Sequence, residues 1–356
     1  MKTLLKTEDQ YNLSPLAYPW ALESYKKARG NFWKPEQVAM GRDLAQFRLL
    51  SDPEREMFLD VFATLTTSDL AIQENIAMRI YETLTPPEIR LWLGHQLADE
   101  SLHSYSYQHV IECLSLDDHS IYYRYKEKPY LLQKFEIGNQ YAQRIVQHDH
   151  FNKILGIAFF YLCWEGIWFY HGFTPIFALG RQGKLPGTCE QLQYIARDEV
   201  THFEFGSKVV NGLLDEEARL YGNDLRKRPD FIKAIRAMFT ELYEGEKVYA
   251  ESCIRPILGY SAEIHLAHTR YLINVRLNQI GMEALYPNDL KAAVPWLSEM
   301  IELKKEKNFF ETHVTEYQTG SQLQFESIPM DEIMNWNKSV PYFDSTPDHP
   351  FTKASA

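Results

Sequence analysis

The pattern glutamate-x-x-histidine occurs twice in this sequence of 356 residues, as Glu100 with His103 and as Glu199 with His202. Residues three positions apart lie on one face of an α-helix, so each pair would direct a carboxylate and an imidazole toward the same point. With twelve histidines in the chain, about one such match is expected by chance. Either pair alone is therefore more readily explained as a surface ion pair, and the case for a shared site depends on further residues.

Two more acids strengthen that case. Glu165 lies in the apolar run Phe-Tyr-Leu-Cys-Trp-Glu-Gly-Ile-Trp-Phe-Tyr, where an unpaired carboxylate would carry a large desolvation penalty that a metal cation would relieve. Asp69 has Thr and Ser neighbours that could satisfy it, and for both acids a hydrogen-bonded structural role is the alternative. Asp69 precedes Glu100 by 31 residues and Glu165 precedes Glu199 by 34. Each interval suits an antiparallel helix pair that brings both acids to one level.

Two such helix pairs would form a four-helix core that offers four carboxylates and two imidazoles. This donor set suits two iron or manganese ions that are bridged by carboxylates and keep open positions for oxygen. Zinc suits it less well, because zinc sites are mostly four-coordinate and rarely recruit four acids. The predicted metal ligands are Asp69, Glu100, His103, Glu165, Glu199 and His202.

The elements that must position these ligands are predicted to be helices, since alternating β patterns are nearly absent. Residues 51–54 and 85–88 each have the form of a capping box with proline in the first turn, and residues 188–191 would open another helix. Pro175 is expected to kink or stop the apolar helix that precedes it. The predicted helices cover residues 51–83, 85–116, part of 129–150, 152–174, 188–214, 230–255, 261–280 and 290–310.

These helices predict one all-α domain over residues 1–311, followed by a flexible tail over residues 312–356. The net charge of −11 and the lack of a basic stripe argue against a nucleic-acid partner, because phosphate binding needs clustered cations. The four cysteines are far apart with no CxxC pair, which favours reduced thiols in a cytoplasmic protein. The first residues contain no apolar stretch long enough for a signal peptide.

Residues 151–179 are apolar enough to raise a membrane-spanning alternative. Lys153, Glu165 and His171 lie within this stretch, and charged groups inside a bilayer are costly unless they are paired and functional. We therefore expect no membrane insertion, and instead a helix that is buried on every side within a large bundle.

Four longer stretches carry a resemblance to a known family. The sequence resembles the small, radical-generating subunit of class I ribonucleotide reductase over about residues 20–320. The stretches are Asn-Phe-Trp-Lys-Pro-Glu at 31–36, Asp-Glu-Ser-Leu-His-Ser-Tyr-Ser-Tyr at 99–107, Ala-Arg-Asp-Glu-Val-Thr-His at 196–202 and Asn-Phe-Phe-Glu-Thr-His-Val-Thr-Glu-Tyr-Gln at 308–318. The resemblance implies a ferritin-like fold and a homodimer. It also implies an aspartate as the first metal ligand, which matches Asp69.

The resemblance also implies a radical site. In this family a tyrosine one helical turn beyond the first ligating histidine is oxidised to a stable radical, and Tyr107 stands four residues after His103. Helical spacing independently places Tyr107 on the ligand face, while Tyr105 should face away from it. The alternative is an ordinary core tyrosine.

A stable phenoxyl radical needs an environment without water or reductants. Phe169 and Phe173 follow Glu165 by one and two helical turns, and Ile195 precedes Glu199 by one turn. Helical spacing therefore directs these three apolar side chains to the metals. We expect them to form an apolar cage around the radical, with ordinary core packing as the alternative.

Two further roles are implied by the resemblance. The family relays the oxidising equivalent through a tryptophan, an aspartate and the metal-bound histidine, which match Trp33, Asp198 and His103. Asp198 projects about 100° from Glu199 on the same helix, which suits an acceptor that orients an imidazole on a neighbouring helix. The alternative is a surface acid paired with Arg197.

Tyr317 resembles the tail tyrosine that passes the radical between subunits. The residues after it match no tail pattern, so Tyr342 is a rival for this transfer. Candidate aromatic anchors for the large subunit are Trp336, Tyr342, Phe343 and Phe351, with an unstructured tail that contains aromatics by chance as the alternative.

The sequence thus predicts the radical-generating subunit of a ribonucleoside-diphosphate reductase, which passes a tyrosyl radical to a large catalytic subunit that makes deoxyribonucleotides. A stand-alone oxidase or desaturase with the same ligands is the first alternative, and an iron store or a structural bundle is the second. No nucleotide-binding glycine motif is present. The histidines assigned to the surface or to satisfied interior positions are His95, His109, His148, His150 and His171.

Overall fold

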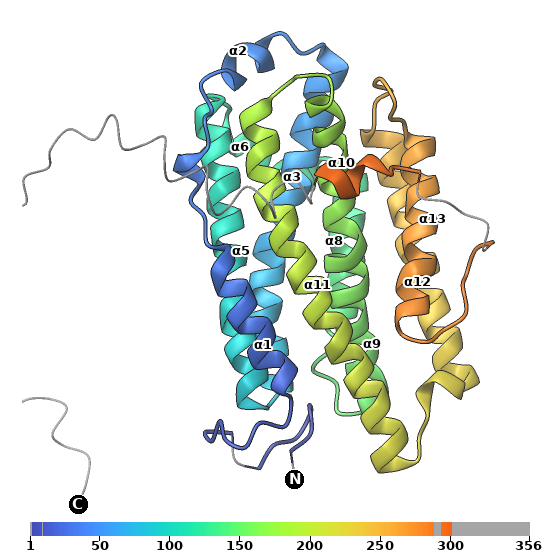
Figure 1. Ribbon diagram of the computed structural model, residues 1–356. Helices are drawn as coiled ribbons and strands as arrows, with labels where there is room; N and C mark the ends of the chain where they lie inside the picture. Colours follow the sequence, from blue (N-terminus) through green and yellow to red (C-terminus); the bar gives the residue numbers. More distant parts are fainter. Residues whose placement is uncertain (1, 9, 288–292, 301–356) are drawn as a thin grey trace, which may run out of the picture. The chain divides into compact units, whose positions relative to one another are not determined.

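The computed structural model describes residues 2–8, 10–287 and 293–300 (Figure 1). Within these residues the secondary structure is helical apart from turns and two isolated β-bridges, so the prediction of an all-α fold is confirmed. The longer helices are α1 (Pro19–Ala28), α3 (Asp52–Asn75), α5 (Pro87–Cys113), α8 (Pro129–Ala142), α9 (His150–Ala158), α10 (Phe169–Gly180), α11 (Pro186–Tyr221), α12 (Pro229–Cys253) and α13 (Ala262–Gln279).

Short elements connect them. They are α2 (Asp43–Arg48), α4 (Tyr81–Thr83), α6 (Asp118–Tyr122), α7 (Arg124–Glu127), the 3-10 turns η1 (Arg29–Asn31), η2 (Pro35–Gln37) and η5 (Leu225–Lys227), and the π-helical segments η3 (Ile76–Ile80) and η4 (Phe159–Trp168). Seven of these elements lie outside the helices predicted from the sequence: α1, α2, α6, α7, η1, η2 and η5. The segments η3 and η4 lie within predicted helices, but their π-helical form was not predicted.

Four helical rods form the centre of the bundle: α3, α5, the continuous η4 and α10, and α11. α3 packs against α5 and α10, while α11 packs against α5, η4 and α10. Figure 1 shows α12 and α13 on one side of these four rods and α1 on the other, in agreement with the contacts of α13 with η4 and of α1 with α5. The four-helix core predicted from the spacing of the acids is therefore present.

One of the two capping boxes predicted from the sequence is confirmed. Ser51 and Glu54 form the expected capping box at the start of α3, with Ser51 N donating to Glu54 Oε2 over 3.0 Å. The second expected box is wrong: α5 begins at Pro87, and Glu88 Oε1 instead accepts hydrogen bonds from the backbone of Ala17 and Tyr18. The Glu88 carboxylate therefore binds backbone amides far away in the chain and does not cap the start of its own helix.

The start of α11 shows the same effect. α11 begins at Pro186, two residues before the expected cap at Thr188. Asp43 of α2 accepts hydrogen bonds from Gly187 N at 3.0 Å and from Thr188 N at 2.6 Å. The exposed amides of this helix start are therefore satisfied by a carboxylate from another helix.

The apolar stretch is one continuous rod through the core. Residues His150–Gly180 are long and apolar enough to cross a membrane, and this window is buried inside the bundle, which makes it a core helix as expected. Of the two outcomes expected at Pro175, a kink or a stop, the stop is wrong, since α10 continues past this residue to Gly180. Packing on all sides outweighs the one backbone hydrogen bond that proline removes.

The C-terminal predictions are only partly covered. Residues 296–300 are helical, within the helix expected at 290–310. The rest of that stretch and the tail at 312–356, including Tyr317, Trp336, Tyr342, Phe343 and Phe351, lie outside the described residues.

Candidate metal centre

The six predicted ligands come from the four central rods and converge at one level. α3 supplies Asp69, α5 supplies Glu100 and His103, η4 supplies Glu165, and α11 supplies Glu199 and His202. All six side chains are fully buried. Their donor atoms form two overlapping groups, Asp69 with Glu100 and His103, and Glu100 with Glu165, Glu199 and His202, and within each group these atoms lie within 4.8 Å of one another. The predicted convergence of these six side chains, which was based on their spacing in the sequence, is therefore confirmed.

Glu100 and Glu199 lie between the two halves of the cluster. His103 Nδ1 is 3.1 Å from Glu199 Oε1 and 3.5 Å from Glu100 Oε2. His202 Nδ1 is 3.1 Å from Glu100 Oε1 and 3.4 Å from Glu199 Oε2. Each imidazole thus directs Nδ1 toward both central carboxylates, an arrangement in which Glu100 and Glu199 can bridge two cations.

The donor atoms are not satisfied by the protein. Both carboxylate oxygens of Asp69, Glu100 and Glu199, together with Glu165 Oε2, are buried and have no hydrogen-bond donor among the described residues. Buried polar atoms are nearly always paired, and unpaired buried carboxylates are especially costly. Seven such oxygens facing one another fit a pair of metal ions, because two cations would satisfy all of them.

The electrostatics support the same conclusion. Burial, followed by repulsion from neighbouring carboxylates, raises the pKa of Asp69 and of Glu165 well above the usual range. Burial alone would lower the pKa of His103 and His202, but the surrounding carboxylates raise it. A bound cation would favour the charged carboxylates and the neutral imidazoles, so metal binding would release protons from these groups.

The outer nitrogens of the two imidazoles meet aspartates in a crossed pattern. His103 Nε2 is 3.5 Å from Asp198 Oδ2, and His202 Nε2 is 3.2 Å from Asp99 Oδ2. Asp198 belongs to the motif of His202, and Asp99 belongs to the motif of His103. Each motif thus supplies the acid that orients the other motif's imidazole.

The role of Asp99 was missed by the sequence analysis. The signal that could have revealed it is the longer pattern Asp-Glu-x-x-His, which occurs at residues 99–103 and again at 198–202. Asp99 also lies 3.6 Å from His95 Nε2, which places His95 in the surroundings of the metal centre rather than at an unrelated position.

Asp198 joins the metal centre to Trp33. The Trp33 indole Nε1 donates to Asp198 Oδ2 over 2.8 Å, and both side chains are buried. Arg197 also pairs with Asp198 at 3.0 Å but is itself buried, so the alternative of a surface pair is wrong. The Trp33 ring stacks on Tyr194 with ring centres 5.0 Å apart. Tyr194, one turn before Asp198, was missed.

Tyr107 is buried beside the same cluster. Burial and the negative charge of Asp69 raise the pKa of its phenol well above the usual value. Its ring meets the ring of Phe62 edge to face, with centres 6.1 Å apart. Phe62 was missed, although it precedes Asp69 by two helical turns. Tyr105 is 47% exposed and hydrogen-bonds Glu36, so it faces away as predicted.

The three residues expected to form a cage are also fully buried. Phe169 and Phe173 stack with ring centres 6.2 Å apart, and Ile195 lies in the core.

The other half of the metal centre, around Glu165, contains a residue that the sequence analysis did not find. Gln96 Nε2 donates to Glu165 Oε1 over 2.8 Å, and Gln96 Oε1 accepts from the Tyr161 hydroxyl over 3.3 Å.

The other histidines lie outside this centre. His150 pairs with Glu217, His109 lies 3.7 Å from Cys113 Sγ, and His148 lines a separate cavity. His171 is fully buried and has no hydrogen-bond partner on either ring nitrogen among the described residues. Its Nδ1 lies 3.6 Å from Glu246 Oε1, so His171 is an interior residue that faces a carboxylate, and the alternative of a surface position is wrong.

Comparisons with known proteins agree with this geometry. The family model described as "Ribonucleotide reductase, small chain" matches residues 10–295. The subunit beta of ribonucleoside-diphosphate reductase from Chlamydia pneumoniae is 32% identical over 328 residues, which cover 89% of this chain and 92% of that protein. The corresponding subunit from Treponema pallidum is 30% identical and covers 88% and 90%.

Two solved structures show the same fold. The ribonucleotide reductase R2 subunit from Clostridium botulinum aligns with a TM-score of 0.70 and 28% identity, over 80% of this chain and 88% of that one. The dimanganese(II)-NrdF of Streptococcus sanguinis aligns with a TM-score of 0.67 and 20% identity, over 83% of this chain and all of that one.

Proposed function

The chain belongs to the ribonucleotide reductase small-chain family, and we propose that Tyr107 is the residue that it oxidises to a stable radical. Its function is that of a small subunit of ribonucleoside-diphosphate reductase. The proposal assigns the metal ions to Asp69, Glu100, His103, Glu165, Glu199 and His202. These oxygen and nitrogen donors suit iron and manganese alike, and the name of the streptococcal relative specifies manganese for that protein.

The position of the Tyr107 phenol is the observation that carries the proposal. When bound, a redox-active metal pair supplies the one-electron oxidation. The phenol must lose its proton in the same event, and we propose the carboxylate of Asp69 as the acceptor, because Asp69 is the first charged neighbour to raise the Tyr107 pKa. Tyr107 is fully buried with the ring of Phe62 against it, and the exclusion of water favours a long-lived radical.

Trp33 lies at one end of the proposed path for radical transfer from the core. The indole Nε1 donates to Asp198, and Asp198 faces the outer nitrogen of the proposed ligand His103. We propose that electrons move along this line between Tyr107 and a large catalytic subunit, with Tyr317 in the tail as the next carrier. The proposal includes a cytoplasmic homodimer as the working form of the chain.

A stand-alone oxidase or desaturase is not favoured. Such an enzyme could use the same six ligands, but it would have no use for the line of contacts from Trp33 through Asp198 to His103. The matching family and the named relatives also point away from it.

The test is to load the metal-free protein with ferrous iron in air and record its electron paramagnetic resonance spectrum. We expect an organic radical signal in the wild-type protein and none in Tyr107→Phe. Metal content, measured on the same samples, should be equal, because the phenol is not a ligand. A signal that survives Tyr107→Phe unchanged would refute the assignment of Tyr107.

A further inference from the structure

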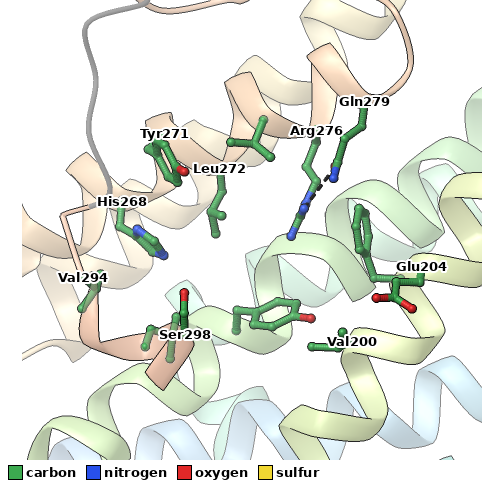
Figure 2. Close-up of a pocket in the computed structure, with 13 residues that line it drawn as sticks. Val200, Glu204, His268, Tyr271, Leu272, Arg276, Gln279, Val294 and Ser298 are labelled. Atoms are coloured by element: carbon green, nitrogen blue, oxygen red, sulfur yellow. Dashed lines mark hydrogen bonds between the residues drawn. The ribbon is translucent and has the colours of Figure 1, made fainter. Parts of the chain in front are cut away.

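A cavity of about 400 Å³ lies between α10, α11 and α13, beside the metal centre. Figure 2 shows His268, Leu272 and Arg276 along α13, with Val200 of α11 on the opposite wall. Val200 follows the proposed ligand Glu199 in sequence. The walls combine apolar side chains with a few polar groups, as small-molecule sites commonly do.

Arg276 is an unusual wall residue because its charge is not paired. It is only 8% exposed, and among the residues that the structure describes no carboxylate lies within 4.0 Å of its guanidinium. Its nearest partners are the Gly166 carbonyl, which accepts from Nε at 2.9 Å and from a terminal nitrogen at 2.7 Å, and the Phe203 ring, 3.8 Å away. A buried cation without an anion is costly.

The guanidinium keeps free hydrogen-bond donors. Nε and one terminal nitrogen each use an N–H on Gly166 O, and the other terminal nitrogen uses one on Gln279 Oε1 at 3.1 Å. A guanidinium has five N–H groups, so one remains on each terminal nitrogen. With one free N–H on each terminal nitrogen, the guanidinium can donate to both oxygens of a carboxylate.

His268 adds a second unused group in the same cavity. It is 5% exposed, and neither ring nitrogen has a hydrogen-bond partner among the described residues. Burial lowers its pKa to about 3, so the imidazole is neutral at pH 7 and offers one donor and one acceptor. The carboxylate on this wall, Glu204, is held by Lys27 at 3.3 Å, which reduces its repulsion of an anion.

We propose that this cavity binds a small organic carboxylate with an apolar body, with its carboxylate on the free N–H groups of Arg276. The apolar body would lie against Val200 and Leu272, and His268 would contact a polar substituent. The cavity is too small and too polar for a long acyl chain. This site is separate from the proposed radical chemistry and does not depend on it.

Benzoate is a suitable probe, because it joins a carboxylate to a compact apolar ring. Calorimetric titration of the metal-loaded protein should give one site per chain with a Kd below about 1 mM. Benzamide has the same shape without the charge, and we expect it to bind at least about tenfold more weakly if the guanidinium is the anchor. Equal binding of the two, or no binding of benzoate at about 10 mM, would overturn the proposal.

Variants distinguish this site from benzoate binding at the metals. Arg276→Gln should abolish benzoate binding, while Arg270→Gln on the same helix, whose side chain bonds Tyr243 outside the cavity, should not. Arg276 also supports the segment that carries Glu165, so Leu272→Trp provides a second test that fills the cavity and leaves every proposed metal ligand in place. Benzoate binding that persists in Leu272→Trp would refute the site.

Discussion

Replacing Asp99 by asparagine should weaken one half of the metal centre and spare the other. His202 directs Nδ1 at Glu100 and Glu199, so a neutral, metal-binding imidazole must carry its proton on Nε2. Asp99 Oδ2, 3.2 Å away, accepts that proton's hydrogen bond. Asparagine keeps the shape of the side chain but loses the charge that fixes the tautomer and makes the imidazole a stronger donor.

The size of the effect follows from this single contact. Loss of such an orienting partner typically lowers metal affinity by about 10- to 100-fold, which corresponds to roughly 1.4–2.7 kcal/mol. His103 has its own partner in Asp198, so only one of the two binding events should weaken. Asp198→Asn should weaken the other event and should also disturb Trp33, which shares the same oxygen.

The metal-free protein can be titrated with Mn²⁺ while the electron paramagnetic resonance signal of the free ion is recorded. This measurement separates the two metal-binding events. A matched control is Asp215→Asn, because the Asp215 side chain is 69% exposed and pairs with Arg226 at the surface. We expect that control to bind like the wild type. Unchanged binding in Asp99→Asn, or equal weakening of both events, would show that the crossed pairing does not support the ligands.

Two further predictions concern stability. Gly206→Ala should lower the free energy of unfolding by about 1–3 kcal/mol or more, because the added Cβ would lie 2.0 Å from the Tyr161 ring. Gly94→Ala, on an exposed helix face with nothing within 4 Å of the added Cβ, should raise the free energy of unfolding by about 0.5–1 kcal/mol. Thermal unfolding of both variants measures the two effects, and similar shifts in the two variants would contradict the prediction. Burial lowers the pKa of His171 well below its usual value, so the unfolded chain binds the proton first and stability falls as the pH drops below about 6.5, by up to about 1.4 kcal/mol per pH unit. The urea concentration at which half of the protein is unfolded should then fall less between pH 7 and pH 5 in His171→Gln than in the wild type. An equal fall in both proteins would contradict a lowered pKa of His171 in the folded state.

The convergence of the six proposed ligands could be predicted from the sequence because it depends on local rules of helix geometry. A helix repeats every 3.6 residues, so Glu100 and His103 must share a face, and the interval from Asp69 to Glu100 is the length of a helix hairpin. The helix starts at Pro87 and Pro186 could not be predicted in this way. At Pro87 the backbone of Ala17 and Tyr18 engages the Glu88 carboxylate, and at Pro186 the helix start is capped by Asp43. Both contacts join residues far apart in the chain, so the local sequence does not indicate them.

The groups around the ligands were harder to predict for a related reason. Gln96 and Tyr194 act through contacts between helices, and their own neighbours in sequence do not mark them as special. Asp99 differs, since its repeat at Asp198 was visible in the sequence. It was missed because the pattern Glu-x-x-His is one residue too short to include it.

The two Asp-Glu-x-x-His motifs also differ at the position one helical turn beyond the histidine, and this difference bears on the proposal that Tyr107, not Tyr161, is oxidised. Four residues after His103 stands Tyr107, whereas four residues after His202 stands Gly206, and the ring of Tyr161 occupies the space beside it. Both phenols are buried near the cluster. Tyr107 lies by the carboxylate of Asp69, but the Tyr161 hydroxyl meets the amide oxygen of Gln96, which is too weak a base to take a proton. Since a phenol must release its proton when it is oxidised, a radical is favoured at Tyr107 and disfavoured at Tyr161.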